Sequence, residues 1–258
     1  LVLRGETGSD WYYIGLASEG ESVITIDDNA SDTGFDRVAI QGTDQADSFL
    51  FRPDSIFALQ VDADGNTVVG APVQRVNYNI DSNDEINVYG RDGNDSFTFD
   101  DTTAKMSVYG DAGDDTFQVG QVFNSARDNV ESGLKPEDYF DTTLVTQGYI
   151  SNGISYDASL NGGIGEDNFV VYRNVASVDL NGDEDNDTFL VRSFVLVDPD
   201  DENAPVANIN GGQGADLINY AMNAPVNIRG GDGLDTVTIL GTEFGDDYVI
   251  TEDGVYGA

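Results

Sequence analysis

Apolar residues alternate with polar ones in short stretches along the chain, and each such stretch runs into a turn that begins with glycine. Counting that glycine as position 1, nine segments carry Asp at position 6 and an apolar or aromatic residue at position 8. The residue two places before the glycine is Leu, Ile or Val in all nine. Alternation of this kind predicts a strand with one buried face on either side of the turn. The nine segments begin at Gly5, Gly42, Gly90, Gly110, Gly162, Gly182, Gly211, Gly230 and Gly241.

The spacing of these units indicates how they are arranged. Gly90 and Gly110 lie 20 residues apart, as do Gly162 and Gly182. Short strands at such a period are typical of solenoids, in which each unit is one rung stacked on the next. We therefore predict an all-β parallel β-helix, or β-solenoid, over residues 1–258 as a single module of a longer repeat array. Residues 122–148 are expected to form a loop excursion. An antiparallel sandwich with Asp-Gly turns is the alternative.

Charge and composition narrow the possible ligands. The chain has 48 acidic and 11 basic residues, a net charge of −37, which disfavours nucleic acid and anionic membrane surfaces as partners. No apolar stretch reaches the ~18 residues of a membrane span, so membrane insertion is not expected. The chain has no cysteine and no histidine, which excludes thiolate and imidazole metal sites and the Ser-His-Asp and HExxH catalytic arrangements. We therefore expect a protein that is not an enzyme and that binds oxygen-coordinated cations.

The turns supply the oxygen ligands that calcium prefers. A run such as GDAGDD places several carboxylates within a few residues, and their repulsion calls for a cation. Calcium takes six to eight oxygen ligands, more than one turn can offer. Because neighbouring rungs lie ~4.8 Å apart, we expect each ion between two successive turns, bound by the position-6 Asp and backbone carbonyls of both. Glycines at positions 1, 2 and 4 are expected to allow this turn through positive φ.

The position-6 aspartates that the spacing pairs across neighbouring rungs are Asp95 with Asp115, Asp167 with Asp187, Asp187 with Asp216, and Asp216 with Asp235. Asp47 and Asp246 are weaker candidates because Gln45 and Phe244 replace the position-4 glycine, and Asp10 lies near the chain start. For any single aspartate, a solvated turn cap is the alternative role. The full set of candidate metal-binding residues is Asp10, Asp47, Asp92, Asp95, Gly110, Asp115, Gly162, Asp167, Gly182, Asp187, Gly211, Asp216, Gly230, Asp235 and Asp246.

The units resemble the hemolysin-type, or RTX, calcium-binding nonapeptide GGxGxDxUx. The segments GGIGEDNFV (162–170) and GGDGLDTVT (230–238) match it closely. The resemblance implies several Ca²⁺ ions bound in a β-helix, as in very large bacterial secreted and surface proteins. RTX nonapeptides usually follow one another directly, whereas here each stands alone in a rung of about 20 residues. This departure favours a broader β-helix with ions along one edge.

We therefore expect a calcium-rigidified structural and adhesive module of an extracellular bacterial surface protein or filament. Its expected partners are calcium and neighbouring copies or flanking repeats packed end to end. The second hypothesis is a glycan-binding module that uses residues 122–148 or the aromatic cluster of Trp11, Tyr12 and Tyr13 to recognise a surface glycan. A third is a β-helix polysaccharide lyase or epimerase, for which the sequence offers no recognisable catalytic constellation.

Overall fold

The computed structural model describes residues 1–17, 20–28, 34–63, 65–80, 84–192, 204–221, 224–241, 248–251 and 254–257. These residues are almost entirely strands and turns and contain no α-helix, so the predicted all-β class is confirmed. None of the described helices is long and apolar enough to cross a membrane. Most strands belong to two large sheets, called here sheet A and sheet B.

Both sheets are built mainly from parallel pairs. Sheet A contains, in spatial order, β1 (Val2–Leu3), β3 (Ser22–Asp28), β7 (Val73–Ile80), β6 (Ser55–Leu59), β5 (Ser48–Arg52), β9 (Ser96–Phe99), β11 (Thr116–Val119), β16 (Asn168–Val171), β18 (Thr188–Val191), β20 (Leu217–Ala221) and β22 (Thr236–Leu240). Within it, β6 pairs antiparallel with both of its neighbours. Sheet B contains, in order, β2 (Trp11–Gly15), β4 (Arg37–Gln41), β8 (Glu85–Asp92), β10 (Lys105–Ala112), β15 (Ala158–Ile164), β17 (Val178–Glu184), β19 (Ala207–Gly214) and β21 (Val226–Gly233).

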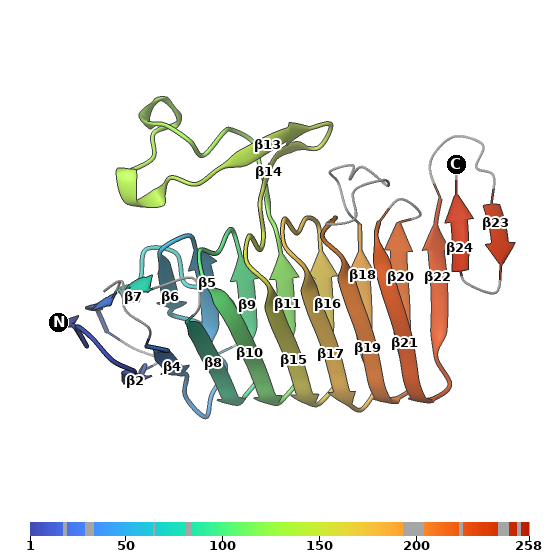
Figure 1. Ribbon diagram of the computed structural model, residues 1–258, viewed down its shortest axis with the longest axis horizontal. Helices are drawn as coiled ribbons and strands as arrows, with labels where there is room; N and C mark the ends of the chain where they lie inside the picture. Colours follow the sequence, from blue (N-terminus) through green and yellow to red (C-terminus); the bar gives the residue numbers. More distant parts are fainter. Residues whose placement is uncertain are drawn as a thin grey trace.

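The chain passes from one sheet to the other through the glycine-aspartate turns. From β8 onward, each strand of sheet B leads through such a turn into a strand of sheet A, and the next rung lies beside it (Figure 1). Val88 is thus opposite Val108, and Phe97 is opposite Phe117. Among the described residues, no β-ladder joins sheet A to sheet B, so the strands do not close into a continuous solenoid.

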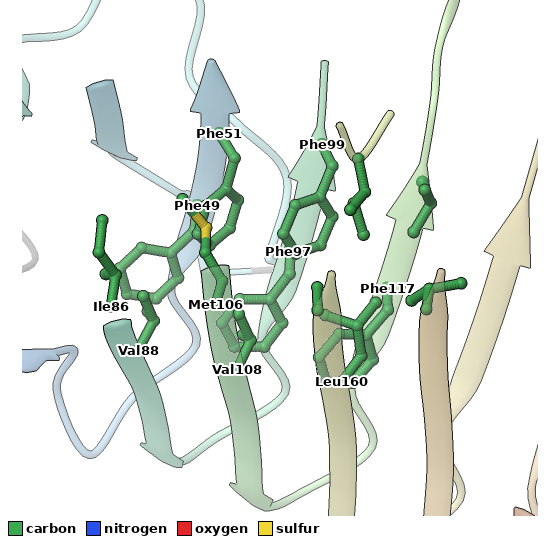
Figure 2. Close-up of a cluster of buried hydrophobic side chains, with 14 of the residues drawn as sticks. Phe49, Phe51, Ile86, Val88, Phe97, Phe99, Met106, Val108, Phe117 and Leu160 are labelled. Carbon is green, nitrogen blue, oxygen red and sulfur yellow. The ribbon is translucent and has the colours of Figure 1, made fainter. Parts of the chain in front are cut away.

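The apolar alternation in the sequence fills the space between the two sheets. The position-8 phenylalanines of successive rungs stack in sheet A, with ring centroids 4.7–5.3 Å apart, and the branched residues of sheet B face them (Figure 2). Parallel stacks of identical rings bury large apolar areas and hold neighbouring rungs in register. The stacked rings are those of Phe49, Phe97, Phe117, Phe169 and Phe189.

Two parts of the chain lie outside these sheets. Residues 122–148, between β11 and β15, contribute β12 (Val122–Phe123), β13 (Thr142–Val145) and the start of β14 (Gly148–Ser151), which form a small antiparallel sheet. Two short 3₁₀ helices, η1 (Val130–Ser132) and η2 (Pro136–Asp138), complete the segment, which projects above the array in Figure 1. Near the C-terminus, β23 (Tyr248–Thr251) and β24 (Gly254–Gly257) form an antiparallel pair.

Candidate functional site

Among the described residues, seven glycine-aspartate turns lie along one edge of the array, called here the main edge, where strands of sheet B pass into strands of sheet A. They span residues 42–47, 90–95, 110–115, 162–167, 182–187, 211–216 and 230–235. In the turn 110–115, both Asp111 and Gly113 have positive φ, 72° and 136°. The turns are also joined to one another, because the Gly93 N–H donates to the carbonyl of Ala112 in the next rung at 2.9 Å. They therefore form one continuous stack.

The position-6 aspartates form a ladder along this edge. The backbone N–H of Asp95 donates to Oδ1 of Asp115 at 2.7 Å, and that of Asp115 donates to Oδ1 of Asp167, also at 2.7 Å. The same bond links each member of the series to the next. The ladder comprises Asp47, Asp95, Asp115, Asp167, Asp187, Asp216 and Asp235.

All four aspartate pairs expected from the spacing are neighbours in this ladder. The structure adds two that the spacing did not predict, Asp47 with Asp95 and Asp115 with Asp167. The members of each added pair are 48 and 52 residues apart in the sequence. Between Asp115 and Asp167 the segment 122–148 leaves the two sheets, whereas between Asp47 and Asp95 the chain forms β6 and β7 within sheet A; in both cases it then returns to the stack of turns.

The second carboxylate oxygen of the ladder is buried and lacks a partner. Among the described residues, Oδ2 has no hydrogen-bond partner in Asp95, Asp115, Asp167, Asp187 and Asp216. Each of these side chains is almost fully buried. A buried charged group without a compensating partner is strongly unfavourable. The ladder therefore presents five carboxylates whose charge the described residues leave uncompensated.

Burial changes the acidity of these carboxyls. Desolvation, with smaller contributions from neighbouring ladder carboxylates, raises the pKa of Asp115 and of Asp187 to about 8. The same cause raises the pKa of Asp95 and of Asp167 to about 7. Burial also raises the pKa of Asp216. Without a cation, several of these groups hold protons near neutral pH.

Glycine at position 1 has a different role from the one expected. Positive φ occurs at positions 2 and 4 in all of these turns except 42–47, and at position 1 in none of them, so that part of the expectation was wrong. A Cβ added at Gly110 would overlap Oδ2 of Asp115 and lie 2.7 Å from the carbonyl oxygen of Gly162. The same overlap occurs at Gly162, Gly182, Gly211 and Gly230 with their own position-6 aspartates. Position 1 is thus glycine because the buried carboxylate lies against its Cα.

The remaining candidates have different surroundings. Oδ2 of Asp47 accepts hydrogen bonds from the N–H and the hydroxyl of Thr43, at 2.6 and 3.0 Å, so it has partners within its own turn. Asp235 ends the described ladder and is half-buried. Asp92, at position 3 of its turn, is exposed. Asp246 lies outside the described residues.

Asp10 was expected on the same edge, and this expectation was wrong. Its turn leads from β1 of sheet A into β2 of sheet B, so it lies at the opposite edge. There, Asp10, Asp28 and Asp36 each bring one carboxylate oxygen within 4.8 Å of the others, a cluster that could hold a metal ion. The Asp10 N–H donates to Oδ1 of Asp36 at 2.7 Å, and the Asp36 N–H donates to Oδ1 of Asp84 at 2.8 Å. A second, shorter aspartate ladder therefore runs along this edge.

Sequence reasoning missed Asp28 and Asp36, which stand in no glycine-aspartate unit. A signal was nevertheless present. Asp36 and Asp84 are each followed by an apolar residue two places later, at Val38 and Ile86, which is the spacing between positions 6 and 8 of the repeat. Both aspartates directly precede strands of sheet B. An Asp two residues before the first buried position therefore indicates ladder membership without the glycine.

Chemically, the main edge offers buried carboxylate oxygens stacked beside tightly turned backbone, the oxygen-rich donor set that Ca²⁺ prefers. The orphaned Oδ2 atoms fit a cation, because a bound cation would compensate their buried charge. No family model, no curated protein and no solved structure matches this chain. The argument for function therefore depends on this geometry.

Proposed function

We propose that the chain is a calcium-binding structural module, in which Ca²⁺ ions bound between stacked turns rigidify a β-solenoid. The observation that carries this proposal is the set of five buried ladder carboxylates whose Oδ2 atoms lack a hydrogen-bond partner. Each ion would be held by ladder aspartates of two successive turns, such as Asp95 with Asp115 or Asp187 with Asp216. Turn carbonyl oxygens would complete the coordination. When bound, the ion supplies charge compensation and cross-links two rungs.

The β-solenoid interpretation is supported by the periodicity of both sheets. Consecutive rungs place chemically matching residues side by side, as with Phe117 beside Phe97 and Val108 beside Val88. Each rung contacts mainly its two neighbours, so stability depends on the interfaces between rungs. An ion between turns would strengthen those interfaces by offsetting the repulsion between ladder carboxylates of neighbouring rungs.

We propose an extracellular location, on the surface of a bacterium or in a secreted filament, with an adhesive or scaffolding role. Extracellular calcium modules bind with dissociation constants of ~10⁻⁴–10⁻³ M, a range in which the ion is plentiful only outside cells. Binding to the folded state alone would stabilise it by mass action, by ~2.7 kcal/mol for each site at a hundred times its dissociation constant. Loading would therefore accompany export.

End-to-end packing with another copy or a flanking repeat is part of the proposal. Among the described strands, β21 and β22 are the outermost at the C-terminal end of their sheets, and β1 and β2 are the outermost at the N-terminal end. Val237 on β22 and Val2 on β1 are both exposed at these ends. Outermost strands expose unpaired backbone groups, and solenoids cover them with caps or with further repeats.

The test is calcium titration of calcium-depleted protein, followed by circular dichroism and isothermal calorimetry. We expect Ca²⁺ to raise the midpoint of thermal unfolding strongly and Mg²⁺ to have little effect. A variant with Asp115→Asn and Asp187→Asn should bind fewer ions. Asp128→Asn, a matched change at an exposed aspartate in the segment 122–148, should bind as many as the parent. Unfolding that is the same with and without calcium would refute the proposal.

A further inference from the structure

We propose that the outer face of sheet B binds a neutral polysaccharide chain. This face is distinct from the turn edges, so the inference does not rest on calcium binding. Two rows of outward-pointing residues run along it, one from Tyr13 to Asn227 and one from Gly15 to Arg229. Each row takes one residue from every strand of the sheet. These sixteen positions are called here the amide face, and sheet B is the nearer of the two large sheets in Figure 1.

The amide face is electrically neutral in a strongly acidic protein. Its sixteen positions include one acidic residue, Asp179, and one basic residue, Arg229. The chain as a whole carries 48 acidic and 11 basic residues. A face without net charge offers no attraction to a polyanion or a polycation. Its chemistry is suited to an uncharged ligand that binds by hydrogen bonds.

Side-chain amides dominate the hydrogen-bonding groups of this face. The Asn181 amide donates to Oδ1 of Asn161 at 2.9 Å, and the Asn227 amide donates to Oδ1 of Asn208 at 2.8 Å. These hydrogen bonds between side chains of neighbouring strands fix the orientation of the amides. An amide group has two N–H donors and two acceptor sites, so capacity remains for an outside partner. Oriented amides of this kind can bind the hydroxyl groups of sugars, which both donate and accept.

Aromatic rings complete the face at its N-terminal half. Tyr89 and Tyr109 stack with ring centroids 5.0 Å apart and an interplanar angle of 8°. At the end of the sheet, Tyr13 is 65% exposed and Trp11, which lies on the same side of β2, is 74% exposed. Exposed Trp and Tyr rings combine an apolar surface with a polar group and can pack against the C–H face of a sugar ring.

Two shallow depressions lie on this face. One of about 520 Å³ lies over β8, β10, β15, β17 and β19, and its lining includes Ser107 and Ser159 of the amide face together with the charged residues Glu85, Lys105 and Asp157. The other, of about 370 Å³, lies over β17, β19 and β21, and is lined by residues that include Asn181 and Asn210. Asp179 and Asn208 line both. The depressions therefore adjoin and follow the rows, a shape that suits an extended chain with repeating units.

A protein partner fits this face less well. Protein interfaces are enriched in aromatic and apolar residues at their buried centre. The sixteen positions of the amide face include no Val, Leu, Ile, Met or Phe. Neighbouring strands lie ~4.8 Å apart, and amides follow one another on successive strands at Asn161, Asn181 and Asn210 and again at Asn208 and Asn227. Such repetition matches a polymer of identical uncharged units.

The test uses calcium-loaded protein with laminarin, galactomannan and dextran as neutral probes, and alginate as the charged comparison. We expect at least one neutral polysaccharide to bind, measured by affinity electrophoresis and calorimetry, and alginate not to bind. Asn181→Ala with Asn208→Ala should weaken binding about tenfold or more. The matched control, Gln118→Ala with Asn219→Ala, removes two amides from the outer face of sheet A and should leave binding unchanged.

A second variant covers the case in which the first one fails to fold. Trp11→Ala with Tyr13→Ala changes two exposed rings and should weaken binding at least fivefold while the unfolding midpoint is kept. Absence of binding to all three neutral probes by folded protein would overturn the proposal, as would equal loss in the sheet A control. Self-association that the Asn181→Ala and Asn208→Ala changes abolish would also overturn it, by identifying a second copy as the occupant. None of these results bears on calcium loading, which the unfolding midpoint reports separately.

Discussion

The turns 42–47 and 110–115 belong to the same stack, but they differ in the hydrogen bonds that they offer to the buried position-6 aspartate. Both Asp47 and Asp115 are buried, and both belong to the aspartate ladder. The backbone N–H of Asp47 donates to Oδ1 of Asp95, and Oδ1 of Asp115 accepts from the backbone N–H of Asp95. In the first turn, Thr43 donates twice to Oδ2 of Asp47. In the second, Oδ2 of Asp115 lacks a partner. One turn therefore satisfies its carboxylate internally, and the other leaves it available to an ion.

The two turns differ in the residue at position 2 and in its backbone conformation. Asp111 occupies this place in the turn 110–115 with φ of 72°. Thr43 is not among the residues with positive φ, a region that β-branched side chains rarely enter. The backbone of the turn 42–47 therefore takes another path, on which the Thr43 N–H and hydroxyl meet the carboxylate. The turn 42–47, which has Thr43 at position 2 and Gln45 in place of the position-4 glycine, thus gives its carboxylate two hydrogen bonds where the turn 110–115 gives none to Oδ2.

The largest expected effect is a pH dependence that calcium reverses. The pKa values of Asp95, Asp115, Asp167 and Asp187 are raised to about 7 or 8, above the value of ~3.9 in the unfolded chain. In calcium-depleted protein, the free energy of unfolding should therefore be highest below pH ~4 and fall as the pH rises to about 8. With saturating calcium it should rise over the same range, because the ion needs ionised carboxylates.

Urea unfolding at a series of pH values, with and without calcium, measures this effect. Burial raises the pKa of Asp47 as well, but its hydrogen bonds from Thr43 act against that rise, so Asp47→Asn should change the slopes less than the same change at Asp115. The double change Asp115→Asn and Asp187→Asn should flatten both. Metal-free stability that does not vary between pH 4 and pH 8 would contradict the expectation.

The next largest effect is expected at the position-1 glycines. Gly110→Ala places a methyl group against Oδ2 of Asp115 and 2.7 Å from the Gly162 carbonyl oxygen, so we expect a loss of more than ~3 kcal/mol in the free energy of unfolding. Gly42→Ala, with Asp47 Oδ2 2.6 Å and the Gly90 carbonyl oxygen 3.0 Å from the new Cβ, should cost less. Chemical denaturation of both variants measures the difference, and equal losses would show that the two turns are equally tight.

Replacing the aspartates by asparagine should give effects of opposite sign. In calcium-free protein above pH ~8, where Asp115 is ionised, Asp115→Asn should stabilise the protein by ~1–3 kcal/mol, because it removes an uncompensated buried charge; with calcium it should destabilise it. Asp47→Asn should destabilise the protein under both conditions, since an amide N–H would face the Thr43 donors. Thermal unfolding of the two variants at the same pH, with and without calcium, tests this; the same sign at both positions in calcium-free protein would argue against the distinction.

The smallest effect is expected for Thr43→Ala. It removes one of the two hydrogen bonds to Asp47 and keeps the backbone N–H bond, so the loss should be about 1 kcal/mol. Thr238→Ala, at an exposed position on β22, is the matched control and should cost less than ~0.5 kcal/mol. A loss no larger than that of the control would mean that the hydroxyl bond contributes nothing measurable.

Much of the fold was predictable from local pattern. The alternation around Gly90 and Gly110 correctly predicted strands on both sides of each turn, and the position-8 phenylalanines correctly predicted one buried side of the second strand. The rungs 20 residues apart lie side by side as expected. These features are local because burial of one strand face requires alternation wherever the strand lies.

Other features depend on contacts between segments far apart in the chain. The pairing of Asp115 with Asp167 joins residues separated by the segment 122–148, and only the return of the chain to the stack brings them together. The turn of Asp10 matches the repeat in sequence but begins from a strand of sheet A, so it lies at the edge where Asp28 and Asp36 gather. A turn motif specifies its own conformation, but the sheet that the flanking strand joins depends on which other strands it pairs with.

The sequence alone thus established the all-β class, the repeating strand-turn-strand unit and the position-6 aspartate of each turn. These features follow from the sequence because alternation and turn chemistry are properties of neighbouring residues. The three-dimensional arrangement settled which turns share an edge, which carboxylates have partners and which side chains form the neutral face of sheet B. Burial and hydrogen bonding depend on what lies opposite each group. Opposite Oδ2 of Asp47 lies Thr43, whereas Oδ2 of Asp115 has no hydrogen-bond partner among the described residues.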